Sequence, residues 1–244
     1  MNFDVDVFIT ALFSRALREG VVMTIALTVV SFAVGVAIGL GIALMRGSRF
    51  AVLRSAGWTY IWLFRALPTL ILLFLVWYGI PQLIPALGGK GFEPFVAAVI
   101  AFSLNEGAYA AEIIRGGLLS IDDGQRIAAR ALGMQPASVF RRIVFPQVIR
   151  VITPALSNDF ITMLKLTSLA YALSLRELLT MAKIQVSSSF QFVEWYGAAA
   201  IYYLVLVSAF MVVQAWFERR YVWASQRRGW RFGVLRGFGG ASGR

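Results

Sequence analysis

The chain has 244 residues, of which 59% are hydrophobic and 14% are charged, a balance too apolar for an ordinary water-soluble domain. Its net charge of +11 would suit nucleic-acid binding, but in so apolar a chain it indicates a membrane protein with cytoplasmic arginines, so we expect lipid and no nucleic acid around it. The absence of cysteine and histidine excludes disulfides, thiol catalysis and histidine-bound metals, and we expect neither a catalytic residue nor a metal.

Several apolar stretches approach the length of about 20 residues that a helix needs to cross a bilayer. They predict an all-α integral membrane protein with five transmembrane helices, near residues 21–45, 58–80, 95–114, 151–173 and 196–216. Residues 1–20 mix apolar and charged side chains and predict an amphipathic helix on the membrane surface. The expected organisation is this segment, a transmembrane domain over 21–218 and a basic cytoplasmic tail over 219–244.

The first two predicted spans carry features that affect packing. Gly35 and Gly39 lie four residues apart, a spacing that allows a neighbouring helix to approach closely. Arg65 and Pro68 interrupt the second span, and an arginine near a helix end can reach the membrane interface with its charged group.

The third predicted span contains Asn105, Glu106, Tyr109 and Glu112. Carboxylates inside a span are costly, so this face is expected to line a protein interior or a water-filled path. Pairing with Arg115 is the simpler explanation for Glu112, whereas Glu106 lies deeper and is the stronger functional candidate.

Residues 115–150 form the longest basic connection in the chain. Their pattern predicts a helix, a break at Gly133, a second helix from about Pro136 and a stop before Pro146. Ala128 and Ala129 leave part of the first helix smooth, which suits docking into a groove on a soluble partner. The arginines around them would equally suit contact with anionic lipid headgroups.

The fourth predicted span keeps Asn158, Asp159, Lys165 and Ser168 among apolar residues. Such polar groups line a path or simply hydrogen-bond between helices. A loop of about 22 residues is then expected before the fifth span.

Arginine and lysine are distributed unevenly among the predicted loops: sixteen lie on one side of the membrane, five lie on the other, and Arg65 and Lys165 fall within spans. The positive-inside rule then places the N-terminus outside and the C-terminus and residues 115–150 in the cytoplasm.

The cytoplasmic connection resembles the EAA loop of ABC-importer permeases, and its flanks resemble the polar amino acid uptake branch of that family. The residues that carry this resemblance are Gly124-Gln125, Ala128-Ala129, Gly133, Ile143 to Pro146, Arg65 to Pro68, Ser103 to Tyr109 and Lys165 to Leu169. Two positions depart from it. Ile127 replaces the glutamate of the EAA motif, and Leu166 stands where many members have aspartate.

The resemblance implies a permease subunit that imports a polar amino acid through a bacterial cytoplasmic (inner) membrane. It implies two ATPase subunits, a second permease copy (identical or homologous) and an extracytoplasmic solute-binding protein as partners. ATP and magnesium would bind the ATPase, since Gly88-Gly89-Lys90-Gly91 is not a phosphate-binding loop and no cofactor is expected on this chain. The resemblance also assigns contact with the ATPase to Ala128, Ala129, Gly133 and Met134.

The polar residues of the third and fourth spans are the candidates for the substrate path: Asn105, Glu106, Tyr109, Asn158, Asp159 and Ser168. We expect Asn105, Glu106, Asn158 and Ser168 to contact an amino-acid zwitterion, a cationic side chain to seek Glu106, and Asp159 to pair with an arginine. One alternative is a stand-alone secondary transporter or channel with Glu106, Glu112 and Lys165 as an ion relay, although no inverted repeat is seen. Another is an intramembrane enzyme, for which only Glu106, Glu112 and Asp159 are available.

Overall fold

The computed structural model describes residues 3–85 and 92–221, with side chains up to residue 216, and every regular element in these ranges is helical. The predicted glycine-rich stretch at 88–91 and most of the predicted basic tail, from residue 222 onward, lie outside the described residues. The all-α class is therefore confirmed for the described part of the chain.

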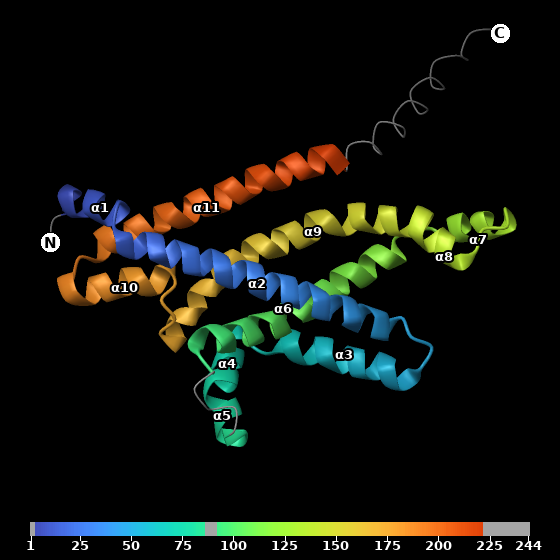
Figure 1. The fold of residues 1–244 in the computed structure, drawn as a ribbon, viewed down its shortest axis with the longest axis horizontal. Coiled ribbons are helices and arrows are strands. Elements are labelled where there is room, and N and C mark those ends of the chain that lie inside the picture. The colour runs from blue at the N-terminus through green and yellow to red at the C-terminus, as the bar shows by residue number, and fades with distance from the viewer. Residues whose placement is uncertain (1–2, 86–91, 222–244) are drawn as a thin grey trace, which may run out of the picture.

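Two long helices, α2 (Arg15–Arg46) and α6 (Pro94–Leu119), form the centre of the molecule (Figure 1). A Cβ atom added at Gly35 would lie 2.6 Å from Cβ of Glu106, and one added at Gly39 would lie 2.7 Å from Cβ of Ala110. Side chains do not fit at such distances, so the two backbones approach closely because both residues are glycine. The structure confirms the predicted packing role of this glycine pair.

The N-terminal segment is divided into two helices. α1 (Val5–Leu12) begins after Asp4, whose carboxylate accepts hydrogen bonds from two backbone amides of the first turn. The chain then breaks at Phe13, and Ser14 caps the start of α2. The part of the expected surface helix that follows Ser14 therefore belongs to α2.

The predicted second span is not one straight helix. α3 (Ala51–Ala66) and α4 (Thr69–Phe74) meet at a break of two residues, and the axis bends by 104° there. Pro68 has no amide hydrogen and biases Leu67 toward the extended backbone that it adopts, so the helix ends before the proline. α4 continues through a π-helical turn (Leu75–Gly79) into α5 (Ile80–Leu83).

The predicted cytoplasmic connection contains α7 (Asp123–Ala131) and α8 (Pro136–Val139), and it breaks at Gly133 as predicted. The expected stop before Pro146 is wrong. A π-helical turn (Phe140–Val144) joins α8 to α9 (Phe145–Leu166), and the helix runs through Pro146. The wider turn carries a bond from the amide of Phe145 to the carbonyl of Phe140 and so makes room for the proline ring.

The expected loop before the last span contains a further helix. After a 3₁₀ turn (Thr167–Leu173), α10 (Leu178–Ser189) begins at Glu177 and buries Leu178, Ala182 and Val186, which repeat every four residues. α11 (Phe192–Tyr221) then packs against α10 and α1, and Tyr202 donates a 2.6 Å hydrogen bond to the carbonyl of Leu12.

Within the described residues, three helices are long and apolar enough to cross a membrane: α2, α6 and the part of α11 that ends at Trp216. The bent pair formed by α3 and the helical segment from Thr69 to Leu83 supplies a fourth span if it is counted as one. α9 does not meet the same test, so the structure supports at least three of the five predicted spans. The turn between α2 and α3 lies at the same end of the molecule as α7 and α8, with α1 and α10 at the other end (Figure 1).

Candidate functional site

A cavity of about 210 Å³ lies among α6, α9 and the start of α4, and we call it the acidic pocket. The residues that line it are Thr69, Asn105, Glu106, Tyr109, Asp159, Thr162, Met163 and Leu166. Four of the six predicted path residues are therefore brought together from two helices, although at least 50 residues separate Asp159 from the other three in the chain.

The pocket contains two carboxylates without a cationic partner. Glu106 is 5% exposed, and one oxygen of its carboxylate is buried without a hydrogen bond. One oxygen of Asp159 is in the same state, and neither residue forms an ion pair with any described residue. Because a buried acceptor without a donor is costly, these oxygens favour a ligand that brings hydrogen-bond donors and positive charge. The predicted pairing of Asp159 with an arginine is therefore not found in the described structure.

Asn105 and Tyr109 shape the same pocket from α6. The side-chain amide of Asn105 donates a 2.9 Å hydrogen bond to the carbonyl of Phe64, near the bend between α3 and α4. The ring of Tyr109 lies 5.2 Å from the guanidinium of Arg65, a cation–π distance. Both residues therefore connect the acidic pocket to the end of α3.

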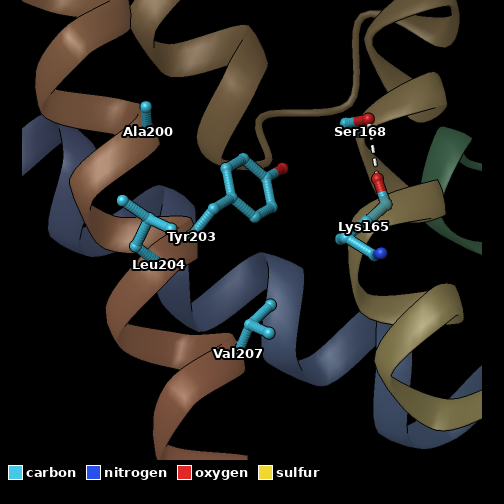
Figure 2. A pocket seen from close by; sticks show the side chains of 6 residues that line it. All are labelled: Lys165, Ser168, Ala200, Tyr203, Leu204 and Val207. Carbon is cyan, nitrogen blue, oxygen red and sulfur yellow. Dashed lines mark hydrogen bonds between the residues drawn. The ribbon is translucent and has the colours of Figure 1, made fainter. Parts of the chain in front are cut away.

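Two predicted path residues lie elsewhere. The side chain of Asn158 accepts a 3.3 Å hydrogen bond from Gln214 on α11, and it does not line the acidic pocket. Ser168 donates to the carbonyl of Lys165 at 2.8 Å and lines a larger, mostly apolar cavity of about 530 Å³ beside α11 (Figure 2). Asp159, one residue after Asn158 and about 100° further around α9, points into the pocket instead.

Four lining residues were not among the predicted path residues: Thr69, Thr162, Met163 and Leu166. Thr162 follows Asp159 by three residues and so shares its helix face, which is a signal that the sequence does contain. Thr69 enters the pocket only because the chain bends after Pro68, and no periodic pattern indicates that bend in advance. Leu166 gives the pocket an apolar wall at the position where the resembling branch often has aspartate.

The ion relay considered as an alternative is not assembled in the described structure. Glu112 pairs with Arg115 at 2.9 Å, as the simpler explanation expected, and lines a different cavity from Glu106. Lys165 lines the apolar cavity beside α11. Three groups in three separate cavities do not form a proton or ion path.

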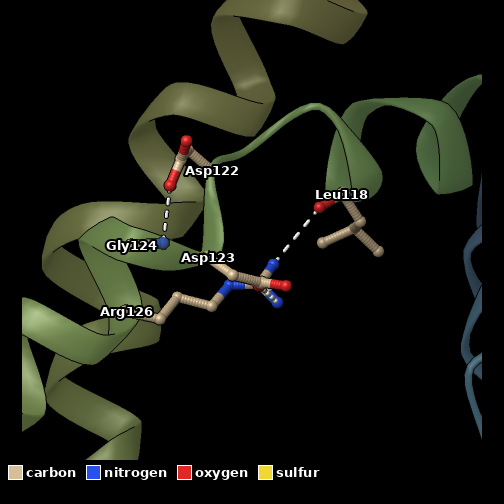
Figure 3. A network of polar contacts seen from close by, with 5 residues as sticks. All are labelled: Leu118, Asp122, Asp123, Gly124 and Arg126. Carbon is tan, nitrogen blue, oxygen red and sulfur yellow. Dashed lines mark hydrogen bonds and ion pairs between the residues drawn. The ribbon is translucent and has the colours of Figure 1, made fainter.

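Arg126 links the helical connection at the other end of α6 and α9 to the end of α6 (Figure 3). Arg126 pairs with Asp123 at 3.1 Å and donates to the carbonyl of Leu118, near the end of α6, at 3.2 Å. Asp122 caps α7 by accepting from the amide of Gly124. α7 is therefore anchored directly to the helix that carries Glu106.

The predicted coupling residues differ in exposure. Ala128 and Gly133 are exposed and Met134 is half-buried, whereas Ala129 is only 4% exposed within a cluster that includes Val139 and Val144. Gly133 has a φ of +79°, a backbone conformation that side chains rarely adopt. Ala129 thus packs α7 onto the following helices, and the exposed positions form the outer face of the turn.

The acidic side chains of the described residues form no group of three or more that could hold a metal ion. The polar groups that the acidic pocket offers to a ligand are therefore its two carboxylates and its neutral side chains.

Comparison with known proteins adds three observations. Residues 35–223 match the family described as "Binding-protein-dependent transport system inner membrane component". The chain is 42% identical over 181 residues to "Probable amino-acid permease protein YxeN" of Bacillus subtilis, which covers 74% of this chain and 80% of that protein. It is 35% identical over 233 residues to "Arginine transport system permease protein ArgU" of Corynebacterium glutamicum, which covers 91% of this chain and 73% of that protein.

A solved structure is also similar. The "Crystal structure of an amino acid ABC transporter with histidines" superimposes with a TM-score of 0.81 at 35% sequence identity. The match covers 90% of this chain and 100% of that chain.

Proposed function

The chain belongs to the family of binding-protein-dependent transport system inner membrane components, and from this premise we propose that it is the permease subunit of an ABC importer for a cationic amino acid. The observation that carries the choice of substrate is the acidic pocket. Glu106 and Asp159 each present a buried oxygen without a donor, and an ammonium or guanidinium group supplies donors and opposite charge together. One similar permease is named for arginine, and the similar solved transporter holds histidines.

The pocket lies where movement of the helical connection would reach it. α6 carries Glu106 and ends at Leu119, α9 carries Asp159 and begins at Phe145, and α7 and α8 lie between them in the chain. Arg126 fastens α7 to the carbonyl of Leu118. A push on α7 would therefore move α6 and α9, which form the two walls of the pocket. This movement would open the pocket alternately to the two sides of the membrane.

We propose that a separate ATPase subunit supplies this push. The exposed residues Ala128 and Gly133 and the half-buried Met134 would contact the ATPase, while Ala129 would keep α7 rigid against the next helix. Ile127 is 67% exposed and so offers an apolar contact at the position of the usual glutamate. ATP and magnesium would bind that partner, and the permease would transmit the work without hydrolysing ATP.

The complete importer would contain two ATPase subunits, a second permease copy and an extracytoplasmic solute-binding protein. The end of the molecule with α7 and α8 would face the cytoplasm, and the end with α1 and α10 would face the periplasm. This orientation is supported by the excess of arginine in the predicted loops at the first end.

The test is transport by the assembled importer in proteoliposomes, with arginine, histidine and glutamate as substrates. Glu106→Gln should lower arginine uptake by about tenfold, since a charge-assisted contact to the substrate is lost. Asp159→Asn should act in the same direction. Glu93→Gln is the matched control, because Glu93 is an exposed carboxylate at the start of the same helix, outside the pocket.

Two results would count against the proposal. Unchanged arginine uptake and unchanged substrate-stimulated ATPase activity in Glu106→Gln would remove the acidic pocket from the substrate path. Uptake by the chain reconstituted alone, without ATP or an ATPase, would favour the stand-alone transporter.

A further inference from the structure

A second polar cavity, of about 460 Å³, lies between the end of α2, α3 and α6, and we call it the arginine pocket. The lining residues used below are Arg46, Trp58, Trp62, Arg65, Tyr109 and Glu112. Only Tyr109 is shared with the acidic pocket.

The arginine pocket carries more positive charge than the one carboxylate in its lining can neutralise. Its single carboxylate, Glu112, is already bound by Arg115 through hydrogen bonds of 2.9 and 3.2 Å. Arg46 and Arg65 form no ion pair with any described residue. Two guanidinium groups therefore remain for an anion.

Arg46 is held in place for such a contact. Its side-chain stem lies against Gly57, where an added Cβ would be 3.2 Å from Cγ of the arginine. Its Nε atom is buried and has no hydrogen-bond acceptor among the residues that the structure describes. A buried guanidinium donor without an acceptor is costly, so this atom points to a ligand that is an acceptor.

Two tryptophans of α3 line the arginine pocket beside Arg46 and Arg65. The rings of Trp58 and Trp62 are stacked, with centroids 6.2 Å apart and planes inclined by 6°, and the residues are 53% and 56% exposed. Tryptophan is enriched at the boundary between lipid and water, because its ring is apolar and its N–H is polar. The pocket therefore combines unpaired arginines with a surface suited to the interface.

We propose that the arginine pocket binds the phosphate headgroup of an anionic phospholipid from the cytoplasmic leaflet. Arg46 and Arg65 would donate to phosphate oxygens, and Trp58 and Trp62 would pack against the glycerol and the first carbons of the acyl chains. The cytoplasmic location rests on the orientation in the proposed function, since Arg46 ends α2 at the same end of the molecule as α7 and α8 (Figure 1). A bound lipid would also hold the stack of Arg65 on Tyr109, and Tyr109 forms part of the wall of the acidic pocket.

The experiment is native mass spectrometry of the importer, extracted in mild detergent after reconstitution with phosphatidylcholine and phosphatidylglycerol. The wild-type importer should retain phosphatidylglycerol in preference to phosphatidylcholine. Arg46→Gln and Arg65→Gln should each retain about fivefold less phosphatidylglycerol. This is the change in affinity expected when one arginine near the membrane surface no longer attracts anionic lipid. Arg46→Lys should retain an intermediate amount because it keeps the charge but loses Nε.

Arg49→Gln is the matched control. Arg49 lies three residues after Arg46 in the same turn, stacks on Phe50 at 5.0 Å and does not line the pocket. The importer with Arg49→Gln should retain as much phosphatidylglycerol as the wild type does. An equal loss in this variant would show attraction to surface charge in general and would overturn the proposal.

Three further outcomes would overturn it: equal retention in Arg46→Gln and wild type, displacement of the lipid by inorganic phosphate, or displacement by arginine. Displacement by inorganic phosphate would show that the pocket binds a free anion, and displacement by arginine would show that it binds the transported amino acid. Substrate-stimulated ATPase activity of the same wild-type sample reports separately on the proposed function. The two proposals can therefore fail independently.

Discussion

Glu106 and Gly35 face each other across the seam between α2 and α6. The glycine leaves room for Cβ and Cγ of the glutamate and lets its carboxylate turn into the acidic pocket. One residue supplies the charge, and a residue on another helix supplies the space.

Gly35→Ala should therefore displace Glu106. The added methyl group would lie 2.6 Å from both Cβ and Cγ of the glutamate, so the helices would have to separate or the glutamate would have to move. We expect a stability loss of about 1–3 kcal/mol, typical of overpacking, with a loss of uptake. Thermal unfolding in detergent and uptake assays would measure both. Gly41→Ala is the control, since an added Cβ there meets nothing within 4 Å, and equal behaviour of the two variants would contradict the explanation.

Glu177 gives a prediction about pH. Its side chain is fully buried at the start of α10 and accepts hydrogen bonds from the amides of Leu179 and Thr180 and from the hydroxyls of Thr180 and Tyr203. Burial raises the pKa of this carboxyl, although those hydrogen bonds lower it in part. Folding thus favours the protonated form, and this contribution to stability is full below the unfolded pKa and is lost as pH rises through the raised pKa.

The unfolding temperature should therefore fall as the pH rises across that window. Glu177→Gln should flatten this dependence, because the amide keeps an acceptor oxygen but does not titrate. Glu177→Ala removes the cap and should cost about 1 kcal/mol or more. If the glutamine variant kept the full pH dependence, another group would be responsible for it.

At the scale of elements, the bend between α3 and α4 shows how a broken helix is stabilised. In a continuous helix the carbonyl of Phe64 would accept from the amide four residues later, but that residue is Pro68 and has no amide hydrogen. The side chain of Asn105 donates to this carbonyl instead. α6 thus completes the hydrogen bonding of α3 at the point where the chain turns by 104°.

A double-mutant cycle between Pro68 and Asn105 should detect this replacement. Asn105→Leu should cost about 1–3 kcal/mol in the wild type, because a part-buried carbonyl loses its donor. On a Pro68→Ala background the new amide can take over, so the same substitution should cost less. Unfolding midpoints of the four proteins give the coupling free energy, and simple additivity would rule out the shared carbonyl.

Prolines also explain why the sequence pattern did not predict all helix ends correctly. Pro81 and Pro146 each follow a π-helical turn, and in both cases the helix passes through the proline instead of ending before it. A proline pattern alone does not reveal whether the preceding turn will widen or break. At Pro68 no such turn forms and the helix ends.

At the scale of the whole molecule, apolar length predicted the helical class, and the glycine pair predicted close approach of a neighbouring helix without indicating that this helix is α6. The acidic pocket was predicted in part, since Glu106 and Tyr109 share a face of one helix. Its other half depends on how α9 is rotated, which places Asp159 and not Asn158 inside, and on the bend that brings Thr69 to it. α10 was not predicted, because its segment is too short and too polar to span a membrane and was interpreted as a loop.

The orientation of the molecule can be tested with single cysteines, because the natural sequence contains none. Ser120→Cys lies at the end of α6, and Ser189→Cys lies at the end of α10, and both positions are exposed. A membrane-impermeant thiol reagent should label the cysteine at 189 in intact cells and the one at 120 only after lysis. The opposite pattern would reverse the proposed orientation.

The seam between α2 and α6 also limits how this protein can change over evolutionary time. At Gly35, at Gly39 and at Gly107 an added Cβ would lie 2.6, 2.7 and 2.8 Å from atoms of the facing helix, so a larger residue at any of the three requires the helices to separate or the facing residue to move. Replacement of any one of these glycines by a larger residue is therefore unfavourable, and we expect the three positions to change rarely. Because the residue that faces Gly35 is Glu106, a lineage that lost this glycine would have to move or replace the proposed substrate carboxylate, so the history of the transported solute is coupled to that of a glycine outside the pocket lining.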